Sequence, residues 1–565
     1  MFLASLTGFS QVVYEDINTA GIYEFLDELA NLRMITLNSA VKPYSRTYIA
    51  QKLHEAFVAD TAATAAGRRP HHLTGRQRKE LAFYLQDYQL ESSSRVTRHA
   101  MPAGRQASRL ADNYDYKLGF LFRKQRDMAL ALNPPGFHYR DSLFTFSLRP
   151  ILGVQWMTNE NGAEYHRWWG GSMFGYIGRN FGFYANLRDN NASIAMAEPR
   201  YLTSAPGNVY KYRENKGVDF SEMRGGMVAS VNWGSLGIMN DRMVWGDNYN
   251  GANILSAKAP AFPYIHLHLN PCKWFDFNYI HGWLNSNVID SSRSYWSDSV
   301  YREIYRNKYI AANMFTFIPW RGLYLSFGNS IIYSDINVNP IYLIPFLFYN
   351  SVDATKNNYT NDAGSNSQLF FNISSRQIRH LHLFFTLFVD EWMTSRLTDP
   401  DEHNFTSLKA GCRVNDFPLR NTSFTAEYTR TQPMTYDHYI PTTTFASNDY
   451  CMGHYLRQNS QELYLAVSFR PLRGVLFNAS YTIAQHGEDI PYDIHAGYPV
   501  QKAPFMGKKT WQNNSFEFTA RYEFVSNGYF FLRYLYSGRS GEVVYQPAVM
   551  NGNTNSFMTG INIGF

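Results

Sequence analysis

Two patterns of apolar residues divide the chain. Near the N-terminus, apolar residues recur three and four positions apart, which places them on one face of an α-helix. The clearest set is Ile22, Phe25, Leu26, Leu29 and Leu32. From about Asp115 onward the period changes to two, with apolar and polar residues alternating as they do in a β-strand. The pattern therefore predicts a short helical segment followed by many β-strands.

The helical segment contains three predicted helices. Pro43 breaks the chain after the first, and Ser45 is a candidate N-cap of the second. The apolar stripe of that second helix consists of Ile49, Leu53 and Phe57. A third helix is predicted to start at Thr74. Helices of about 12 to 18 residues are marginal alone, so we expect them to pack on each other or on the rest of the protein.

The cleanest predicted strand covers residues 515–524, where aromatic residues occupy one face and charged residues the other. The apolar face consists of Phe516, Phe518, Ala520, Tyr522 and Phe524. Residues 462–470, 475–483 and 556–565 repeat the alternation. One such strand fits a soluble β-sandwich equally well, but the last strand ends on an aromatic residue, Phe565. That ending resembles the recognition signal that outer-membrane barrels present to the barrel-assembly machinery, so we expect that machinery to be a partner.

The connections between strands are of two lengths. Four Pro-containing segments, 149–153, 318–322, 417–421 and 470–474, are predicted to be tight turns. Long polar segments lie at 285–306, 350–366, 395–405, 430–460 and 484–513. Short turns at one end and long loops at the other are typical of bacterial barrels, in which the short turns face the periplasm. About 450 residues, at roughly 25 per strand and connection, predict about 18 strands.

The predicted fold class is mainly β: a transmembrane antiparallel β-barrel of about 18 strands with a small N-terminal α-helical segment. Residues 1–11 are interpreted as the remnant of a signal peptide, because they are apolar and small but lack a basic start. A plain frayed terminus is the alternative. Residues 12–110 would form the helical segment, on the periplasmic side, and residues 111–565 the barrel in the outer membrane of a Gram-negative cell.

Composition supports this interpretation. Aromatic residues make up 16% of the chain, yet the mean hydropathy is −0.36. A lipid-facing strand with a polar inner face produces that combination. A transmembrane helix needs about 18 consecutive apolar residues, and the richest apolar run, 341–349, is short and broken by Pro345. The sequence therefore excludes a helical membrane protein.

Several classes of site and partner are disfavoured by the remaining composition. The chain has three cysteines, Cys272, Cys412 and Cys451, without a CxxC motif. Neither a metal site nor a disulfide framework follows from them, although a single pairing stays open. The net charge of +6 is modest and no basic block stands out, which argues against nucleic acid as a partner. We predict no cofactor.

The most distinctive stretch is residues 232–264. It contains, in order, Gly237, Arg242, Trp245, Gly246, Tyr249, Gly251, Leu255, Ser256 and Pro260. This stretch resembles the Wzi family of outer-membrane capsule-assembly proteins, particularly forms found in the Bacteroidetes. Its members carry a strand ending in G-(K/R)-x(n)-WG-P-G-(Y/W)-x-G, followed by Leu-Ser and a Pro-rich segment. This chain departs from the pattern at Asp247-Asn248, where the family usually has Pro-Gly.

The resemblance extends over most of the chain to about residue 400. Further matching segments are 25–53, 277–286, 315–334, 340–349 and 387–392. The resemblance implies a barrel closed to free diffusion by its loops, with the helical segment at the periplasmic end. It also implies a non-enzymatic function, the lectin-like retention of surface polysaccharide at the outer membrane.

Six polar and aromatic residues of this stretch are candidates for a polysaccharide site: Asp241, Arg242, Trp245, Asp247, Asn248 and Tyr249. An aromatic ring stacks on the C–H face of a pyranose, and carboxylates or amides form hydrogen bonds with its hydroxyls. The alternative is that Trp245 and Tyr249 are girdle or loop-packing residues, as aromatic residues in barrels usually are.

Two other groups of residues have the residue types of a catalytic or metal site. Asp390 and Glu391 are adjacent and point to opposite faces of a strand, so they cannot flank one glycosidic bond as a catalytic pair does. Lumen charges paired with arginine are the favoured interpretation. His266 and His268 share a strand face and could bind a metal, but no third ligand is evident. An enzyme is therefore the weaker class, and no catalytic pattern is evident.

The favoured hypothesis is a monomeric barrel, embedded in outer-membrane lipid, that attaches surface polysaccharide. Its extracellular loops would hold a repetitive polymer through several weak contacts, because repeated units raise the effective concentration. One alternative is a diffusion channel whose lumen-facing Arg, Glu and Asp set ion preference. Another is an accessory of an outer-membrane secretion or motility machine, docked through the helical segment.

Overall fold

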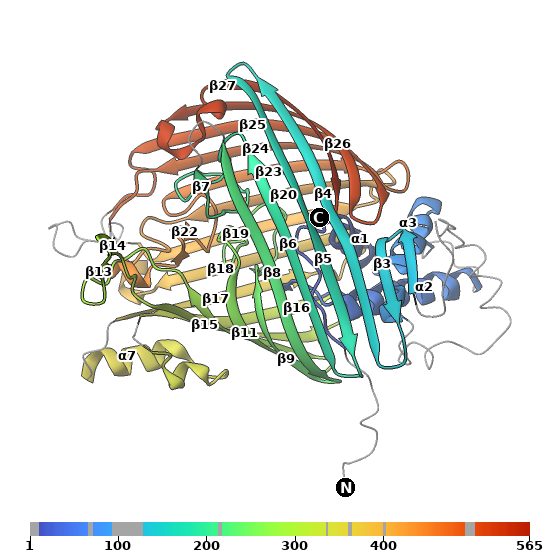
Figure 1. Cartoon of the computed structure of the whole chain (residues 1–565), viewed down its shortest axis with the longest axis horizontal. Helices are drawn as coiled ribbons and strands as arrows, with labels where there is room; N and C mark the ends of the chain where they lie inside the picture. Colours follow the sequence, from blue (N-terminus) through green and yellow to red (C-terminus); the bar gives the residue numbers. More distant parts are fainter. Residues whose placement is uncertain are drawn as a thin grey trace, which may run out of the picture.

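A closed antiparallel β-barrel forms the body of the protein (Figure 1). The computed structural model describes residues 11–65, 72–92, 128–212, 217–334, 337–359, 364–398, 403–491 and 503–564. Eighteen strands close the barrel: β4 Phe144–Asn159, β5 Gly162–Ile177, β6 Phe181–Ala192, β8 Val218–Val231, β9 Gly234–Asp241, β11 Phe262–Cys272, β12 Phe275–Leu284, β15 Lys308–Trp320, β16 Leu323–Tyr333, β17 Ser365–Ser375, β18 Leu381–Glu391, β19 Phe405–Asn415, β20 Thr422–Thr431, β23 Ser460–Phe469, β24 Val475–Gly487, β25 Lys509–Val525, β26 Gly528–Gly541 and β27 Asn553–Ile563.

Closure brings the last strand beside the first. β27 pairs antiparallel with β4, from Ile563 opposite Leu152 to Phe557 opposite Thr158. A short hairpin, β2 Met128–Leu132 and β3 Pro135–Arg140, continues the sheet where β27 stops, because β3 pairs with the beginning of β4. The barrel and its strand number, both predicted from the sequence, are confirmed.

The predicted turn at 149–153 is wrong, because these residues lie inside β4. Along one edge of β4, pairing with β3 ends at Leu148 and pairing with β27 starts at Leu152. Pro150 lies in the gap between these two partners, where its missing N–H costs the sheet no hydrogen bond on that edge. The other three predicted turns, 318–322, 417–421 and 470–474, coincide with short connections between neighbouring strands.

The alternation along the strands separates an apolar outer face from a polar lumen. Phe516, Phe518 and Tyr522 of β25 are 39–46% exposed on the outside, whereas Glu523 is buried. β23 repeats the pattern with Leu463, Leu465, Val467 and Phe469. An outward apolar band of this kind is the surface that a barrel presents to lipid. In the described part of the chain, no helix is long and apolar enough to cross a membrane.

The predicted helical bundle is confirmed, with α1 Ala20–Asn31, α2 Arg46–Ala65 and α3 Gly75–Asp87 as its three helices. The short α4 Gln89–Ser92 follows α3 directly, so the third predicted helix is interrupted at Tyr88. The Ser45 hydroxyl accepts a hydrogen bond from the Tyr48 N–H (3.1 Å), and Thr74 caps α3 in a capping box with Gln77. The buried core of the bundle includes Phe25, Leu26, Leu29, Ile49, Leu53, Leu81 and Phe83. Packing in this core stabilises helices that are too short to be stable alone.

The bundle packs against the end of the barrel that carries the short turns (Figure 1). Arg33 donates to the Gln377 carbonyl in the β17–β18 turn, and Gln77 donates to Asp416 in the β19–β20 turn. The long connections leave the opposite end of the barrel. Among the elements in them that the sequence did not predict are the hairpin of β13 Tyr295–Ser297 and β14 Val300–Arg302, and the helix α7 Tyr349–Tyr359.

Three predictions fall on residues outside the described ranges. They are the signal-peptide remnant, apart from its last residue Gln11, the boundary between helical segment and barrel at 110–111, and the terminal Phe565.

Candidate functional site

The connection between β9 and β11, residues 242–261, turns into the lumen; we call it the inward segment. Its strand β10, Val244–Trp245, pairs with β1, Val41–Lys42, of the N-terminal segment. The Gly246 N–H then donates to the Ala40 carbonyl (2.8 Å). Gly246 has a φ of +92°, a conformation that glycine adopts without strain. Parts of the chain about 200 residues apart are thus joined inside the barrel.

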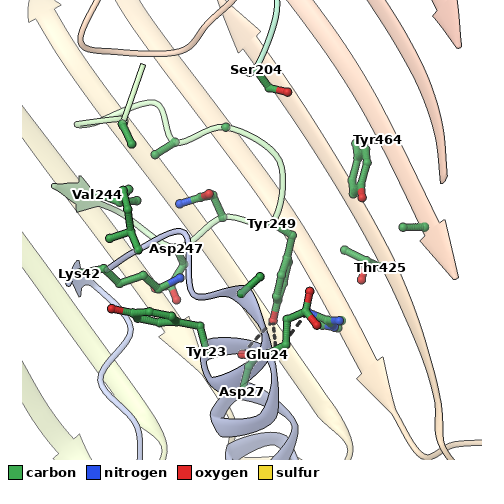
Figure 2. A pocket seen from close by; sticks show the side chains of 18 of the residues that line it. Tyr23, Glu24, Asp27, Lys42, Ser204, Val244, Asp247, Tyr249, Thr425 and Tyr464 are labelled. Atoms are coloured by element: carbon green, nitrogen blue, oxygen red, sulfur yellow. Dashed lines mark hydrogen bonds and ion pairs between the residues drawn. The ribbon is translucent and has the colours of Figure 1, made fainter. Parts of the chain in front are cut away.

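Tyr249 is the centre of a buried polar cluster on the inward segment. Its hydroxyl donates to the Asp27 carboxylate of α1 (2.9 Å) and lies 2.7 Å from Nδ1 of His382 on β18. The Arg413 guanidinium lies over the Tyr249 ring, 4.6 Å from its centroid. Figure 2 shows Tyr249 pointing toward Glu24 and Asp27. The phenol therefore connects the inward segment to both the bundle and the barrel wall.

Asp27 also accepts a hydrogen bond from Arg376 (2.9 Å) in the β17–β18 turn. Burial raises the pKa of the Asp27 carboxyl, but Arg376 and Arg413 outweigh burial and hold that pKa well below its usual value. The group is therefore a carboxylate at neutral pH. A charged pair of this kind is costly to break, because the remaining charge stays buried.

Asp247 makes the second polar contact of the inward segment. It accepts hydrogen bonds from Ser39 and from Asn372 of β17 (2.9 Å), and its own N–H donates to the Asn372 side chain (3.0 Å). Burial raises the pKa of Asp247, but His382 and Arg376, with these hydrogen bonds, lower it below its usual value. The N–H groups of Tyr249 and Asn250 donate to Glu427 of β20 (2.6 and 2.7 Å).

The other four candidate residues have partners of their own. Asp241 receives two hydrogen bonds from Arg224 (2.7 and 2.9 Å), and Arg242 donates to Glu222 (2.9 Å). Trp245 is buried and packs edge-on against Phe370. Asn248 is half-buried and donates to the Gly246 carbonyl.

The structure divides five of the six predicted residues between two cavities. Asp247, Asn248 and Tyr249 line a cavity of about 560 Å³ between α1 and the wall, with Tyr464 and Thr425 on the opposite side (Figure 2). Basic residues of that wall, Arg413, Arg521 and Arg533, also line it. Asp241 and Arg242 line a smaller cavity of about 230 Å³. Trp245 lines neither. The six residues are therefore neighbours in sequence without forming one site, and polysaccharide binding by them stays a prediction.

An exposed group of aromatic residues was missed by sequence reasoning. The hairpin β13–β14, within the connection 285–307, carries Trp296 (71% exposed) and its neighbours Tyr295, Tyr301 and Tyr305, all at least 40% exposed. We call these four residues the aromatic hairpin. The rings of Trp296 and Tyr301 lie 5.5 Å apart. Asp298 and Ser299 both have positive φ, as a two-residue hairpin turn requires. The alternation of YWSDSVYREIY could have revealed it.

The residues considered for a catalytic pair or a metal site have structural partners. Glu391 forms an ion pair with Arg396 (2.7 Å), and Asp390 accepts from the Tyr436 N–H (2.7 Å). His268 lies 2.8 Å from Asp276, and His266 lies 3.1 Å from Asn278. The described residues contain no group of three side chains that could hold a metal ion. All three cysteines, which lie in described parts of the chain, are free thiols.

Comparison with known proteins identifies the fold. No family model and no curated protein matches this sequence. Among solved structures, Wzi of Escherichia coli, described as an outer membrane protein involved in group 1 capsule assembly and a carbohydrate-binding β-barrel, is similar with a TM-score of 0.53 at 10% identity. The match covers 98% of this chain and 100% of Wzi.

Weaker similarities are found to two other barrels. OccD3 (OpdP) of Pseudomonas aeruginosa is 10% identical with a TM-score of 0.41, covering 74% of this chain and 90% of that one. OccAB2 of Acinetobacter baumannii is 11% identical with a TM-score of 0.41, covering 74% and 97%. The protein is therefore a closed transmembrane β-barrel that shares its fold with Wzi over nearly the whole chain.

Proposed function

We propose that this barrel attaches surface polysaccharide to the outer membrane, in a lectin-like way and without catalysis. The observation that carries the proposal is the aromatic hairpin. Large parts of the Trp296, Tyr295 and Tyr301 side chains are exposed. A cluster of aromatic rings exposed to water is usually a binding surface, because such rings are otherwise buried. Arg293 and Asp290, which precede the hairpin in the same connection, are paired at 2.8 Å, and Arg293 also donates to the Tyr305 carbonyl (2.9 Å). Flat apolar rings beside polar groups suit a pyranose.

The position of the hairpin supports the proposal. Bacterial barrels keep their short turns in the periplasm and their long loops outside. The aromatic hairpin belongs to a long connection, and the helical bundle packs on the short turns. In this orientation the rings face the extracellular medium and the bundle faces the periplasm. Surface polysaccharide would then meet the hairpin directly.

The inward segment crosses the lumen, which favours attachment over diffusion. The inward segment has hydrogen bonds to β17, β18 and β20, and it pairs with the N-terminal segment. A channel needs a continuous water-filled path past such a crossing. The diffusion channel remains the alternative function, and steady conductance of the purified barrel in a planar bilayer would favour it. Membrane proteins that co-purify with the barrel would favour the accessory of a secretion or motility machine.

The six residues predicted from the sequence have a secondary place in this proposal. Asp247, Asn248 and Tyr249 would meet only a sugar that enters the cavity of about 560 Å³. The exposed rings would meet a polymer first. Repeated weak contacts between loops and repeating units then retain the chain without one tight site.

The first experiment is deletion of the gene, followed by measurement of polysaccharide on cells and in the medium. We expect the total to stay constant while most polysaccharide moves to the medium. An unchanged partition would refute attachment.

The second experiment assigns the site by complementation. Trp296→Ala with Tyr301→Ala should retain about three- to tenfold less polysaccharide than wild type, because truncating aromatic contact residues typically costs 1 kcal/mol or more. Trp233→Ala is the matched control, since Trp233 is 50% exposed in the β8–β9 turn at the other end of the barrel. Both variants must reach the membrane in wild-type amounts. Full retention by the hairpin variant would remove the hairpin from the proposal.

A further inference from the structure

One long connection folds back over the outside of the barrel instead of leaving it. Residues 337–350, which we call the outer strap, start at the long-loop end after β16 and lead into α7. Figure 1 shows α7 outside the barrel, and its nearest strands are β16 and β17. The strap lies on the lipid-facing side of the wall. Phe315 of β15 contacts Phe346 of the strap. Phe315 is paired with Phe327 of β16 and therefore points to the same face, and Phe327 is 45% exposed on the outer surface.

Aromatic contacts hold the strap to the wall. The Phe346 ring stacks on Phe277 of β12 with centroids 4.7 Å apart. The ring centroids of Tyr342 and Tyr333 lie 4.6 Å apart, and the Tyr279 hydroxyl donates to the Tyr342 carbonyl (2.7 Å). Phe277 is the third residue of β12, close to the short turn that precedes that strand. The strap therefore runs along the membrane-spanning wall well beyond the rim.

Two asparagines of the wall form hydrogen bonds with the backbone of the strap. Asn313 and Asn329 are opposite each other on β15 and β16, on the same outward face as Phe315, and both are buried beneath the strap. Asn313 donates to the carbonyls of Pro345 (2.9 Å) and Leu347 (3.0 Å). Asn329 accepts from the Tyr349 N–H (2.8 Å) and donates to Asn313 (2.7 Å).

These hydrogen bonds are the kind that irregular backbone needs when it lies in the hydrocarbon core of a membrane. Irregular backbone is tolerated at membrane depth only where protein groups satisfy its N–H and C=O groups, because no water is available to do so. On a water-facing surface the same carbonyls would need no asparagine partners. An outward asparagine on a lipid-facing strand is likewise costly unless it is paired.

The outer surface of the strap is apolar. Four of its side chains are 44–56% exposed: Leu343, Ile344, Phe346 and Phe348. They extend the apolar band formed by the exposed wall residues of β16 and β17, Phe327 and Phe371. A run of four large apolar side chains exposed to water would be unfavourable.

We propose that the outer strap is embedded in the membrane, with its outer surface in contact with lipid acyl chains. The continuity with the lipid-facing wall and the satisfied backbone favour lipid as the occupant over a second copy of the chain or another protein. This inference is independent of the proposed function in polysaccharide attachment.

Photo-crosslinking tests the proposal directly. A photoreactive benzoylphenylalanine replaces Phe346 in the full chain, which is reconstituted in dioleoylphosphatidylcholine vesicles, irradiated and analysed by intact mass. The same residue at Phe516, on the lipid-facing wall, and at Trp296, on the aromatic hairpin, sets the two limits. We expect phosphatidylcholine adducts at 346 within about twofold of those at 516 and about tenfold above those at 296.

Two outcomes would overturn the proposal. One is an adduct yield at 346 as low as that at 296, which would place the strap in water. The other is a crosslinked dimer of the chain in place of the lipid adduct, which would make this face an interface between copies. If substitution at 346 prevents folding, Phe348, which is 49% exposed on the same strap, takes its place with the same expectation.

Discussion

The barrel wall is covered on both of its faces, and the two coverings are built differently. Inside, α1 and the inward segment are held by charged groups, with Asp27 between Arg376 and Arg413 and the Tyr249 hydroxyl beside them. Outside, the outer strap is held by stacked rings and by the neutral pair Asn313 and Asn329. These contacts come from different strands of one wall: the inner ones from β17, β18, β19 and β20, and the outer ones from β12, β15 and β16.

The difference follows from the solvent that each face meets. Adjacent residues of a strand point to opposite faces, so one strand can present rings outward and polar groups inward. The lumen contains water and polar side chains, in which an ion pair is tolerated. Next to hydrocarbon a charge is far more costly than a neutral amide that has its partners. Each covering therefore uses the polar group that its surroundings permit.

The largest expected effect is on the inside, at Arg376. Arg376→Met removes the hydrogen bond to Asp27 (2.9 Å) and also the donors to Asn31 and Ser39. We expect a loss of about 3–5 kcal/mol in the free energy of unfolding, since the buried carboxylate keeps its charge with fewer partners. Thermal unfolding and protease cleavage of α1 measure the effect.

A double variant provides the control for this prediction. Asp27→Leu combined with Arg376→Met removes both charges, and it should be more stable than Arg376→Met alone. If the double variant is no better than the single one, the uncompensated charge is not the cause.

The second effect concerns Tyr249. Tyr249→Phe removes the hydrogen bond to Asp27, for which we expect a loss of about 1.5–3 kcal/mol, the range for hydrogen bonds to charged groups. Polysaccharide retention should stay near wild type, because the hydroxyl is already engaged. Tyr428→Phe, which removes an exposed hydroxyl bonded to Gln461, is the control. Loss of retention at unchanged stability would instead place Tyr249 in a sugar site.

The third effect is on the outside. Asn313→Leu leaves the Pro345 carbonyl without its donor and removes the shorter of two hydrogen bonds to the Leu347 carbonyl, which keeps a 3.4 Å hydrogen bond from Asn329. We expect a cost of about 1–3 kcal/mol. Amide exchange of the outer strap should increase while exchange of the bundle stays unchanged. Asn513→Leu on β25, an asparagine bonded to Ser515 and Ser537, controls for the loss of a strand asparagine. Equal exchange in both variants would contradict the assigned role of Asn313.

The smallest effect separates the two coverings by pH. Burial raises the pKa of Asp87 on α3, but Arg149 and Arg46 outweigh it and lower the pKa from 3.8 to about 2. A carboxyl with a depressed folded pKa stabilises the docked bundle above its unfolded pKa, and that stability is lost as pH falls through the folded pKa. As pH falls from about 4 to 2, amide protection, measured relative to the intrinsic exchange rate at each pH, should therefore decrease in the bundle and stay constant in the outer strap. A parallel decrease in both would show general unfolding.

Much of the fold follows from local pattern. The helices that begin after Ser45 and Thr74 and the alternation in 515–524 depend on neighbours within a few residues. The number of strands follows from the length of the alternating region. The error at 149–153 also comes from local pattern. Pro150 indicates a break in strand pairing, and such a break occurs both at a turn and where a strand changes its partner, as β4 does here. The sequence also identified the inward segment as unusual.

The candidate site was less predictable. Asp247 and Tyr249 have the residue types of a sugar site, and those types equally suit a buried polar crossing of the lumen. Their partners Ser39, Asp27 and Asn372 lie 208, 222 and 125 residues away in the chain. No local pattern encodes such pairings.

By itself, then, the sequence determined a barrel with an apolar outer face, a polar lumen and a helical bundle at its beginning, because these depend on periodicities of two and 3.6 residues. Only the tertiary structure decided where each long connection folds. Residues 242–261 turn into the lumen, the outer strap turns onto the lipid-facing wall, and the aromatic hairpin projects from the long-loop end. The physical reason is that the direction of a loop is set by the distant wall residues that satisfy its backbone and charges.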